Sequence, residues 1–421
     1  MYVVSLIKRD EKMKRKGIMT MCMTLLGAVN VAAQVEVKLA ELGMENIRTA
    51  RSEKGVAVAF EDRAFRSSYE GVGRAVKSAL EGMTENGELR MAVMDANGLP
   101  QLEICMDKKL VAAYRNGEAT LHDVFGQMEL SCSTDRTLAL LKGTETTEKS
   151  AWRPDLVVYP HLFLENTSFD RLYKYAIALA PAIEMPLWKG AELSAQVILP
   201  IVGNQKGELK QVRPGIVAVR QGFYLKKNWT LQLTAGQFTN HRLGGRGDIK
   251  WRNDNGRWEL GAQAGLTVYS IFVDREWTLT RKPKLDAKLY GRVYIPRWNT
   301  ELTGEAARFV YGDYGVKGSA VRHFGECTVG LYALYTEGHV NGGFNFAIPL
   351  PGKKYNRWKG MRLKPADYFT YEYGMVAWGE YVDQNLGVSY TTATGENRTR
   401  GFYQPEYIRY FLMKDCQRFE D

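Results

Sequence analysis

Cysteine and histidine are scarce in this sequence, which has five of each among 421 residues. So few cysteines exclude a scaffold held together by disulfides. No His-x-x-x-His or Cys-x-x-Cys spacing occurs, so the sequence contains no metal-site motif. The Gly-x-Ser-x-Gly nucleophile elbow is missing as well. The motifs therefore point to no catalytic residues, and no metal or other cofactor is expected.

Long apolar runs are also absent beyond residue 33. The nearest candidate, residues 175–183, is interrupted by Pro181 and followed by Glu184. A membrane-spanning helix needs about 20 predominantly apolar residues in succession, so none is predicted. The chain is expected either to be soluble or to span a membrane as a barrel of strands.

The N-terminus has the pattern of an export signal. A basic segment, residues 12–16, precedes a mostly apolar run from Gly17 to Val29, and small residues follow up to Ala33. This order is typical of a secretory signal peptide. We therefore predict a signal peptide over residues 1–33 and export of the remainder, with a buried N-terminal helix as the alternative.

Aromatic residues and charge divide the chain into two regions. Only 7 of the 48 aromatic residues precede residue 154. Residues 34–153 hold 16 basic and 19 acidic side chains, a net charge of −3, whereas residues 154–421 hold 35 and 26, a net charge of +9. Two regions that face different solvents would produce such a division.

Residues 34–150 are predicted to form a small α/β domain. The segment 67–80 is expected to be a helix, with Val72, Val76 and Leu80 on one face because they are spaced by four. Cys105 and Cys132 are the only cysteines of this domain, and their spacing leaves open a disulfide or two separately buried thiols. A further helix is expected over residues 36–44, and strands over residues 46–50, 56–60, 89–94 and 101–106, the last two joined as a hairpin by Asn97-Gly98.

Residues 154–421 alternate between apolar and polar side chains with a period of two. In the segments 258–269 and 285–295 the apolar residues lie on one face, and residues such as Glu259 and Lys288 lie on the other. Strands of roughly 9–11 such residues cross a bilayer, and at roughly 22 residues per strand and turn the region holds about twelve strands. We therefore predict an α+β chain, with a small periplasmic α/β domain followed by an antiparallel outer-membrane β-barrel over residues 154–421. A soluble β-sandwich or propeller is the alternative.

Turn residues lie between these strands, and aromatic residues lie near their ends. Asn255-Gly256 predicts a two-residue hairpin loop between the strands that carry Trp251 and Trp258. Aromatic residues gather near strand ends, as they do at the two interfaces of a membrane barrel. The pattern therefore favours a barrel over a soluble sheet.

Several short segments carry a resemblance to a known family. They are residues 43–48, 60–63, 308–316, 322–325, 329–336, 342–350 and 363–373. Taken in this order, they resemble the YjbH family of outer-membrane exopolysaccharide proteins. The resemblance implies a periplasmic domain and an outer-membrane β-barrel, linked to making or exporting an extracellular polysaccharide. It supplies no catalytic residues.

One basic segment stands apart from the strands. Residues 351–365 hold six cations and two aromatic residues. Tyr355 and Trp358 can stack on sugar rings, and Arg357 and Arg362 can bind acidic groups of a polymer. These four are the candidate polysaccharide-binding residues. The alternative is a basic loop near lipid headgroups or solvent.

These observations favour a non-enzymatic protein of the cell outer membrane, with its N-terminal domain in the periplasm, that assists production, export or anchoring of an extracellular polysaccharide. The expected partners are outer-membrane lipid, an acidic polysaccharide and other proteins of an exopolysaccharide system. Nucleic acid is not expected to bind an exported barrel, despite the net charge of +10. The alternatives are an outer-membrane enzyme acting on lipid or polysaccharide, and a general porin, which would not explain the α/β domain.

Overall fold

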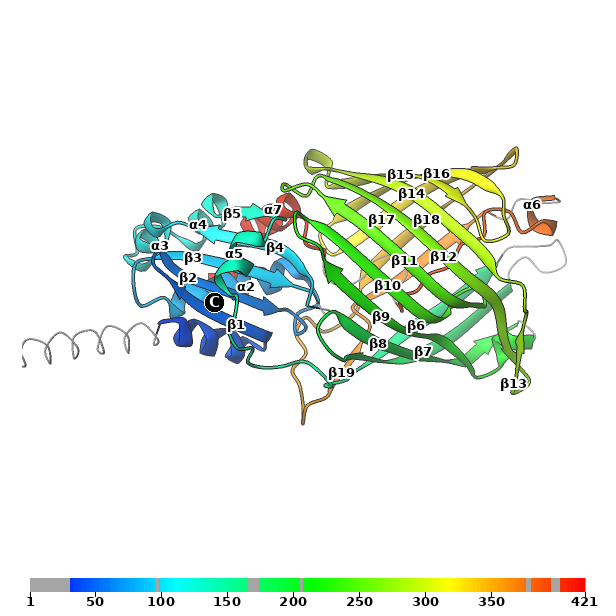
Figure 1. Cartoon of the computed structure of the whole chain (residues 1–421), viewed down its shortest axis with the longest axis horizontal. Coiled ribbons are helices and arrows are strands. Elements are labelled where there is room, and N and C mark those ends of the chain that lie inside the picture. The colour runs from blue at the N-terminus through cyan, green and yellow to red at the C-terminus, as the bar shows by residue number, and fades with distance from the viewer. Residues whose placement is uncertain are drawn as a thin grey trace, which may run out of the picture.

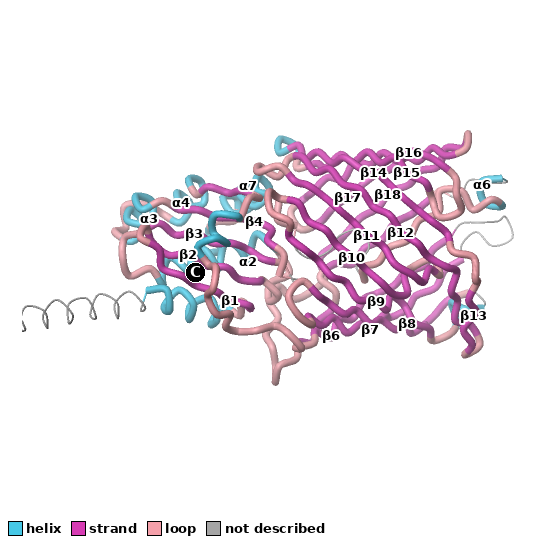
Figure 2. Tube along the Cα trace, in the orientation of Figure 1, coloured by secondary structure: helices cyan, strands magenta, loops and turns pink. Residues whose placement is uncertain are grey.

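A computed structural model describes residues 31–95, 98–165, 174–204, 207–375, 380–394 and 402–420. It consists of an α/β unit and a large sheet, and the α/β unit lies at one end of that sheet (Figure 1). Figure 2 shows that helices gather in the α/β unit, whereas the rest of the chain is mostly strands and turns. No helix of the described residues is long and apolar enough to cross a membrane.

The α/β unit is built on a five-stranded sheet in the order β1-β2-β3-β4-β5. β2 and β3 are parallel because helix α2 (Ser68–Gly82) crosses over between them, and the other neighbours are antiparallel. The expected hairpin over residues 89–94 and 101–106 is confirmed, although Asn97 lies outside the described residues. The strands are β1 (Glu45–Ser52), β2 (Gly55–Glu61), β3 (Glu88–Met94), β4 (Pro100–Met106) and β5 (Glu129–Ser131), and the short helices are α3 (Lys108–Arg115), α4 (Leu121–Gln127) and α5 (Asp135–Leu140).

Helices from both ends of the described chain pack with this sheet into one core. Val72, Val76 and Leu80 of α2 are buried, as their spacing predicts. Residues 31–42 are also helical, and their apolar residues Val31 and Val35 belong to the same buried cluster. Residues 1–30 of the predicted signal peptide lie outside the described residues, so cleavage after Ala33 stays a prediction.

The C-terminal residues complete this core instead of extending the large sheet. Helices α7 (Pro405–Lys414) and α8 (Gln417–Glu420) bring Phe411 and Phe419 into the buried cluster. The Phe411 ring stacks on Tyr69 of α2, with centroids 5.3 Å apart. Their aromatic-rich composition predicted that these residues belong with the strands of the region 154–421. The structure instead joins both ends of the described chain in the α/β unit.

The described cysteines are all free thiols. Cys105 and Cys132 are separately buried, and burial raises the pKa of both thiols, that of Cys105 to about 12. Arg252 donates to Cys132 Sγ at 3.8 Å. The alternative of two buried thiols therefore describes this pair.

Within the described residues, the second unit is a 15-stranded sheet, and its three short strands account for the excess over the expected twelve. These are β13 (Glu276–Leu279), β19 (Arg362–Pro365) and β20 (Tyr368–Gly374). The twelve longer strands pair antiparallel in chain order: β6 (Asp155–Glu165), β7 (Lys174–Pro186), β8 (Ala191–Gly203), β9 (Arg213–Tyr224), β10 (Trp229–Phe238), β11 (Arg242–Arg252), β12 (Trp258–Val273), β14 (Lys284–Ile295), β15 (Thr300–Arg308), β16 (Tyr314–Phe324), β17 (Cys327–Thr336) and β18 (His339–Pro349).

Burial confirms the period-two pattern of these strands. In β12, Leu260 and Leu266 are exposed on the outer face, whereas Glu259 and Thr267 are buried on the inner face. β14 repeats the pattern, with Leu289 exposed. Apolar residues thus face outward and polar residues inward, which reverses the arrangement of a soluble protein with an apolar core.

Residues 362–374 hydrogen-bond to both ends of the strand order. β19 pairs with β6 in parallel, and β20 pairs with β18 antiparallel. Between β19 and β20, the Ala366 N–H donates to Val158 O at 2.9 Å. Since β19 and β20 are separated by only two residues, one stretch of chain joins the first and the last of the twelve long strands.

The turn between β11 and β12 differs from the prediction. It comprises the five residues 253–257 instead of the two-residue Asn255-Gly256 loop, and of that pair only Gly256 has a positive φ, of +70°. A Cβ on Gly256 would lie 2.6 Å from Pro405 Cδ and 3.0 Å from Cys132 Sγ. The turn is longer because it reaches the α/β unit, where Asp254 O accepts from the Cys132 N–H at 2.7 Å.

After β20 the chain returns along the inner face of the sheet. Figure 1 places α6 (Glu380–Asp383) at the end far from the α/β unit, and α7 at the near end. Between them, residues 385–394, which we call the inner segment, bond to inward-facing side chains. Tyr390 donates to Asp286 Oδ1 at 2.8 Å, and Arg246 donates to Thr392 Oγ1 at 2.6 Å. The inner segment thus fills part of the space on the inner side of the sheet.

Candidate functional site

A cavity of about 630 Å³ lies between the inner face of the sheet and the α/β unit. Its walls come from inward-facing strand residues, from residues 392–394 of the inner segment, and from Asp62, Asp95 and Leu99 of the α/β unit. Because side chains of a strand alternate between its faces, every second residue of a strand can reach this space. Concave sites with a few convergent polar groups are the usual places for ligands, so we take this cavity as the candidate site.

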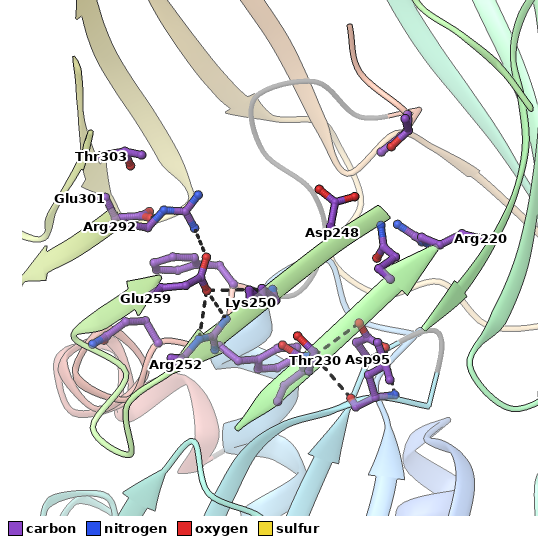
Figure 3. A pocket seen from close by; sticks show the side chains of 18 of the residues that line it. Asp95, Arg220, Thr230, Asp248, Lys250, Arg252, Glu259, Arg292, Glu301 and Thr303 are labelled. Carbon is purple, nitrogen blue, oxygen red and sulfur yellow. Dashed lines mark hydrogen bonds and ion pairs between the residues drawn. The ribbon is translucent and has the colours of Figure 1, made fainter. Parts of the chain in front are cut away.

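Three cations surround Glu259 on one wall of the cavity (Figure 3). Arg252 on β11 and Arg292 on β14 are the cross-strand partners of Glu259 on β12, so all three share the inner face. The Glu259 carboxylate is 3.2 Å from Arg252, 3.5 Å from Arg292 and 4.0 Å from Lys250. These four side chains together carry more positive than negative charge. The strand register brings them together on the inner face.

A second carboxylate extends this group along the wall. Arg292 Nε is 3.4 Å from Glu301 on β15, and Glu301 Oε1 is 2.5 Å from Nε2 of His323 on β16. The His323 ring stacks on Phe402, with centroids 4.4 Å apart, and its Nδ1 has no hydrogen-bond partner in the described part of the chain. Glu301 and His323 thus place a carboxylate and an imidazole within hydrogen-bond distance of each other on the cavity wall.

Acidic groups balance these cations elsewhere in the cavity. In Figure 3, Asp248 and Arg220 lie apart from the Glu259 cluster. Glu184 accepts from Thr394 Oγ1 at 2.6 Å and from the Tyr159 hydroxyl. The lining includes seven Lys and Arg residues and nine Asp and Glu residues. The cavity therefore presents both signs of charge instead of a single-sign field.

The four predicted binding residues lie outside this lining. Tyr355, Arg357 and Trp358 are in the loop between β18 and β19, and Arg362 is the first residue of β19. The loop is docked on the α/β unit, where the Tyr355 N–H donates to Ala64 O at 2.9 Å. Trp358 is exposed to solvent and its ring is 4.9 Å from Lys359 Nζ. The structure therefore keeps Trp358 accessible but turns Arg357 and Arg362 toward the protein.

Both arginines are held by carboxylates of the same chain. Arg357 forms a two-pronged contact to Glu45, at 2.5 and 3.2 Å, and Arg362 bonds to Glu45 at 2.9 Å and to Asp155 at 3.2 Å. Burial opposes ionisation of Glu45, but the hydrogen bond from Arg357 and the charge of Arg362 outweigh it and lower its pKa. These contacts join the loop, the α/β unit and the first strand of the large sheet.

The same buried network continues toward the cavity. Arg63 follows β2 and bonds to Asp155 at 3.1 Å and to Glu192 on β8 at 3.5 Å. Glu192 also accepts from Arg220. Arg63 and Asp155 are almost completely buried. Buried charges of this kind need all their partners, because removing one leaves the other unpaired.

Sequence reasoning placed Glu259 and Lys288 on a polar strand face, but it did not identify a site there. The available signal was that the polar face of neighbouring strands contains charged residues at mid-strand, such as Asp248 and Arg292. No sequence pattern indicated that Asp95 of the α/β unit would line the same cavity as these strand residues. Among the described residues, no group of three or more His, Cys, Asp or Glu residues could hold a metal ion.

Comparison with known proteins gave one result. The family model described as "Exopolysaccharide biosynthesis protein YbjH" matches residues 11–350, which is most of the chain. Neither the curated proteins nor the solved structures gave a match. The matched range includes the α/β strands and the strands up to β18.

Proposed function

We propose, since the chain belongs to the YjbH family of exopolysaccharide biosynthesis proteins, that it is a non-enzymatic outer-membrane protein. In this proposal the large sheet is a β-barrel and the α/β unit lies in the periplasm. The protein assists production, export or anchoring of an extracellular polysaccharide. The observation that carries the proposal is the apolar outer face of the sheet, opposite a polar inner face.

The outer face exposes large apolar side chains on nearly every long strand. Leu289 on β14 and Leu331 on β17 are each 65 % exposed, and Leu199, Leu233 and Leu302 are exposed on other strands. Soluble proteins rarely expose contiguous apolar surface on this scale. A membrane barrel requires it, because its outer face contacts lipid while its interior is polar.

The pairing at the ends of the strand order supports a closed barrel. A strand edge left unpaired in lipid would cost several kcal/mol per backbone group, so membrane-spanning sheets close on themselves. Residues 362–374 supply hydrogen-bonding partners to β6 and to β18. This single stretch would close the barrel with one parallel contact between otherwise antiparallel strands.

Exposed aromatic residues support an orientation in a bilayer. Trp229, Trp258 and Trp298 begin or precede strands at the end nearest the α/β unit, and Trp277 and Tyr314 lie at the other end. Aromatic residues at two levels are typical of the two membrane–water interfaces. The α/β unit extends beyond the first level and would therefore stand in the aqueous periplasm.

The cavity gives this barrel a place for a saccharide. Its polar and charged walls also carry aromatic faces, including Tyr290, Tyr294 and Tyr368. Hydroxyl-rich polymers bind by hydrogen bonds and by packing on such rings. An acidic polysaccharide and further proteins of an exopolysaccharide system are the partners we propose.

Cell fractionation and a polysaccharide assay test the proposal together. We expect the full chain in the outer-membrane fraction, resistant to extraction at alkaline pH. Deletion of its gene should lower surface polysaccharide per cell, and a plasmid copy should restore it. Protease added to intact cells should spare residues 34–150 and cleave them after the outer membrane is permeabilised. A chain recovered in the soluble fraction would refute the membrane assignment.

A second candidate function is an enzyme acting on the saccharide, and the Glu301–His323 pair is the observation in its favour. An acid–base pair facing a cavity is a common catalytic arrangement. Under the non-enzymatic proposal, His323→Gln should leave surface polysaccharide unchanged at equal protein abundance. Loss of polysaccharide with an intact, correctly folded variant would favour the enzyme.

A further inference from the structure

A second cavity lies on the outside of the junction between the two units. It has a volume of about 250 Å³, and none of the described residues lines both cavities. Glu61 and Arg48 line it from the α/β unit, and Trp188 lines it from the turn between β7 and β8. These three side chains take no part in the arginine–carboxylate network around Asp155 or in the first cavity as described above.

Glu61 is buried without full hydrogen bonding. Its side chain is 1 % exposed, and its Oε2 atom has no hydrogen-bond partner among the described residues. An unsatisfied buried oxygen costs free energy, so such atoms in native proteins call for an explanation. The cavity beside Glu61 provides one, since a ligand with a hydroxyl or amine donor would satisfy this oxygen.

Arg48 is a charged side chain beside the same cavity. It is half-buried and makes no ion pair with any described residue, and burial lowers the pKa of its guanidinium. A β-bulge in β1 lies just before it, because Glu45 pairs with Glu61 and Arg48 pairs with Ala59, which leaves one extra residue in β1. Bulges commonly redirect side chains at functional sites.

The bulge is locked by its own contacts. Asn46 adopts a left-handed conformation with φ of +49°, which is tolerated by asparagine better than by most residues. Its side chain donates to Ser150 Oγ at 2.7 Å and accepts from the Ser150 N–H at 3.0 Å. The two hydrogen bonds to Ser150 keep Asn46 in this strained conformation, and they thereby maintain the shape of the cavity wall.

Trp188 supplies an aromatic face with a fixed orientation. The side chain is 57 % exposed, and its indole N–H donates to Gln221 Oε1 at 2.8 Å. Lys149 and Lys189 also line this cavity. The site therefore combines an aromatic face, three cationic side chains and one buried carboxyl group.

We propose that this second cavity binds one anionic sugar unit, a hexuronate or similarly charged pyranose, of the polysaccharide. The apolar face of the pyranose ring packs on Trp188, a sugar hydroxyl donates to Glu61 Oε2, and Arg48 binds the sugar carboxylate with help from Lys149 and Lys189. The inference rests on the proposed function, and it adds a periplasmic binding site outside the barrel together with a sign of charge for its ligand.

The protonation of Glu61 is compatible with an anionic ligand. Burial is the main cause that raises its pKa to about 8, against the opposing charge of Arg63, while Asp95 and Glu45 add to the increase. At neutral pH the carboxyl group is therefore largely neutral. It can accept from and donate to hydroxyls without repelling a sugar carboxylate.

Binding of defined oligosaccharides to the purified full chain tests the inference. The probes are a glucuronate-containing tetrasaccharide and a neutral glucose tetrasaccharide, each titrated by calorimetry into protein in detergent. We expect the charged probe to bind at least tenfold more tightly. Trp188→Ala and Arg48→Gln should each weaken its binding at least tenfold. Trp298→Ala, at a residue that is 56 % exposed on another turn, is the matched control and should leave the affinity for the charged probe unchanged.

Glu61→Leu separates binding from folding. It removes the unsatisfied oxygen, so the variant should unfold at the same or a higher temperature and yet lose at least tenfold in affinity for the charged probe. Glu61→Gln keeps a donor and an acceptor and should retain most of the affinity. If neither probe binds, or if the Trp188, Arg48 and Glu61→Leu variants bind like the wild type, the site is refuted. Equal affinity for both probes would refute the anionic class.

These outcomes are distinct from failure of the proposed function. A chain that fractionates as soluble but binds the charged probe through Trp188 and Arg48 overturns the membrane proposal and keeps the sugar site. A chain that resides in the outer membrane and supports polysaccharide production, but whose Arg48 and Trp188 variants bind the charged probe normally, keeps the function and overturns the site.

Discussion

Tyr390 of the inner segment stacks flat on Phe238 of β10, with ring centroids 5.4 Å apart and ring planes inclined by 7°. The two residues are 152 positions apart, yet both are buried. Gly265 allows this approach, since a Cβ at that position would lie 2.0 Å from the Tyr390 hydroxyl oxygen. The inner segment is thus anchored to the strands by an aromatic stack and by the hydrogen bond to Asp286.

Tyr390→Ala should destabilise the protein by about 3 kcal/mol, because truncation of a buried aromatic ring leaves a cavity. Tyr390→Phe should lose about 1 kcal/mol, the worth of the hydrogen bond to Asp286. Urea unfolding followed by tryptophan fluorescence measures both. Tyr410→Ala is the control, since this exposed tyrosine should change stability by less than about 0.5 kcal/mol. Equal unfolding curves for Tyr390→Ala and the control would show that the segment is not anchored there.

Arginine substitutions on the two faces of β12 should differ sharply if the outer face contacts lipid. Ala264 is exposed on the outer face, and Arg at a bilayer midplane costs roughly 2–4 kcal/mol. Gln263 lies on the inner face between its cross-strand partners Asp248 and Lys288, so an arginine there stays out of lipid and should cost far less. Refolding into lipid vesicles compares the two variants. Equal yields would argue for a soluble sheet.

Gly256→Val should impair folding for two separable reasons. Its φ of +70° disfavours a β-branched residue by roughly 1–2 kcal/mol, and its Cβ would collide with Pro405. Gly338→Val is the matched control, because Gly338 has φ of +83° and no atom of the described residues lies within 4 Å of its Cβ position. The difference in unfolding free energy between the two variants measures the contact with the α/β unit. If both lose the same amount, backbone strain alone is responsible.

Arg357 in the loop between β18 and β19, and Arg362 at the start of β19, should contribute to stability. Arg362→Lys should cost about 2 kcal/mol, because lysine cannot bridge Glu45 and Asp155 with a planar fork. Trp358→Ala should change stability by less than about 0.5 kcal/mol, since the ring is exposed. Surface polysaccharide should fall in the Arg357→Lys, Trp358→Ala, Arg362→Lys variant only in proportion to the folded protein. A larger fall would support the sequence prediction that these residues bind the polymer.

Stability should fall as pH rises because of Glu61. Its pKa is about 8 in the folded protein against an ordinary value of 4.5, so the folded state retains a proton that the unfolded state loses. The favourable contribution is therefore complete below about pH 4.5 and disappears as pH rises to about 8. Glu61→Gln should flatten the pH dependence of the unfolding midpoint between these limits. An unchanged slope in the variant would mean that Glu61 is already ionised in the folded state.

The local features of this fold could be predicted from sequence. The faces of β12 and β14 followed from a period of two, since the pleat of a strand sends neighbouring side chains to opposite sides. The helix that contains Val72 and Leu80 followed from spacing by four, because residues four positions apart lie on one face of a helix. Each of these predictions needs information only from adjacent residues.

Contacts between distant segments could not be predicted in this way. Arg357 and Glu45 are 312 positions apart, and nothing in a basic loop indicates which carboxylate it will meet. The five-residue turn at 253–257 has the same origin, because its length is set by Cys132 and Pro405 of another unit. Likewise the sequence around Phe411 does not distinguish it from other aromatic residues of the C-terminal region. Only the structure shows that it belongs to the buried core of the α/β unit.

The pairing of β19 with β6 joins two segments that are far apart in the sequence. Asp155 and Arg362, which meet at this junction, are 207 positions apart, so the first strand of the sheet is synthesised long before its last partner exists. During that interval β6 exposes a free backbone edge, which is a template for aggregation. Chains that end before residue 362 would keep this edge permanently, and they should aggregate instead of yielding a smaller working sheet. Asp155 and Arg362 can therefore meet only after all twelve long strands have been synthesised.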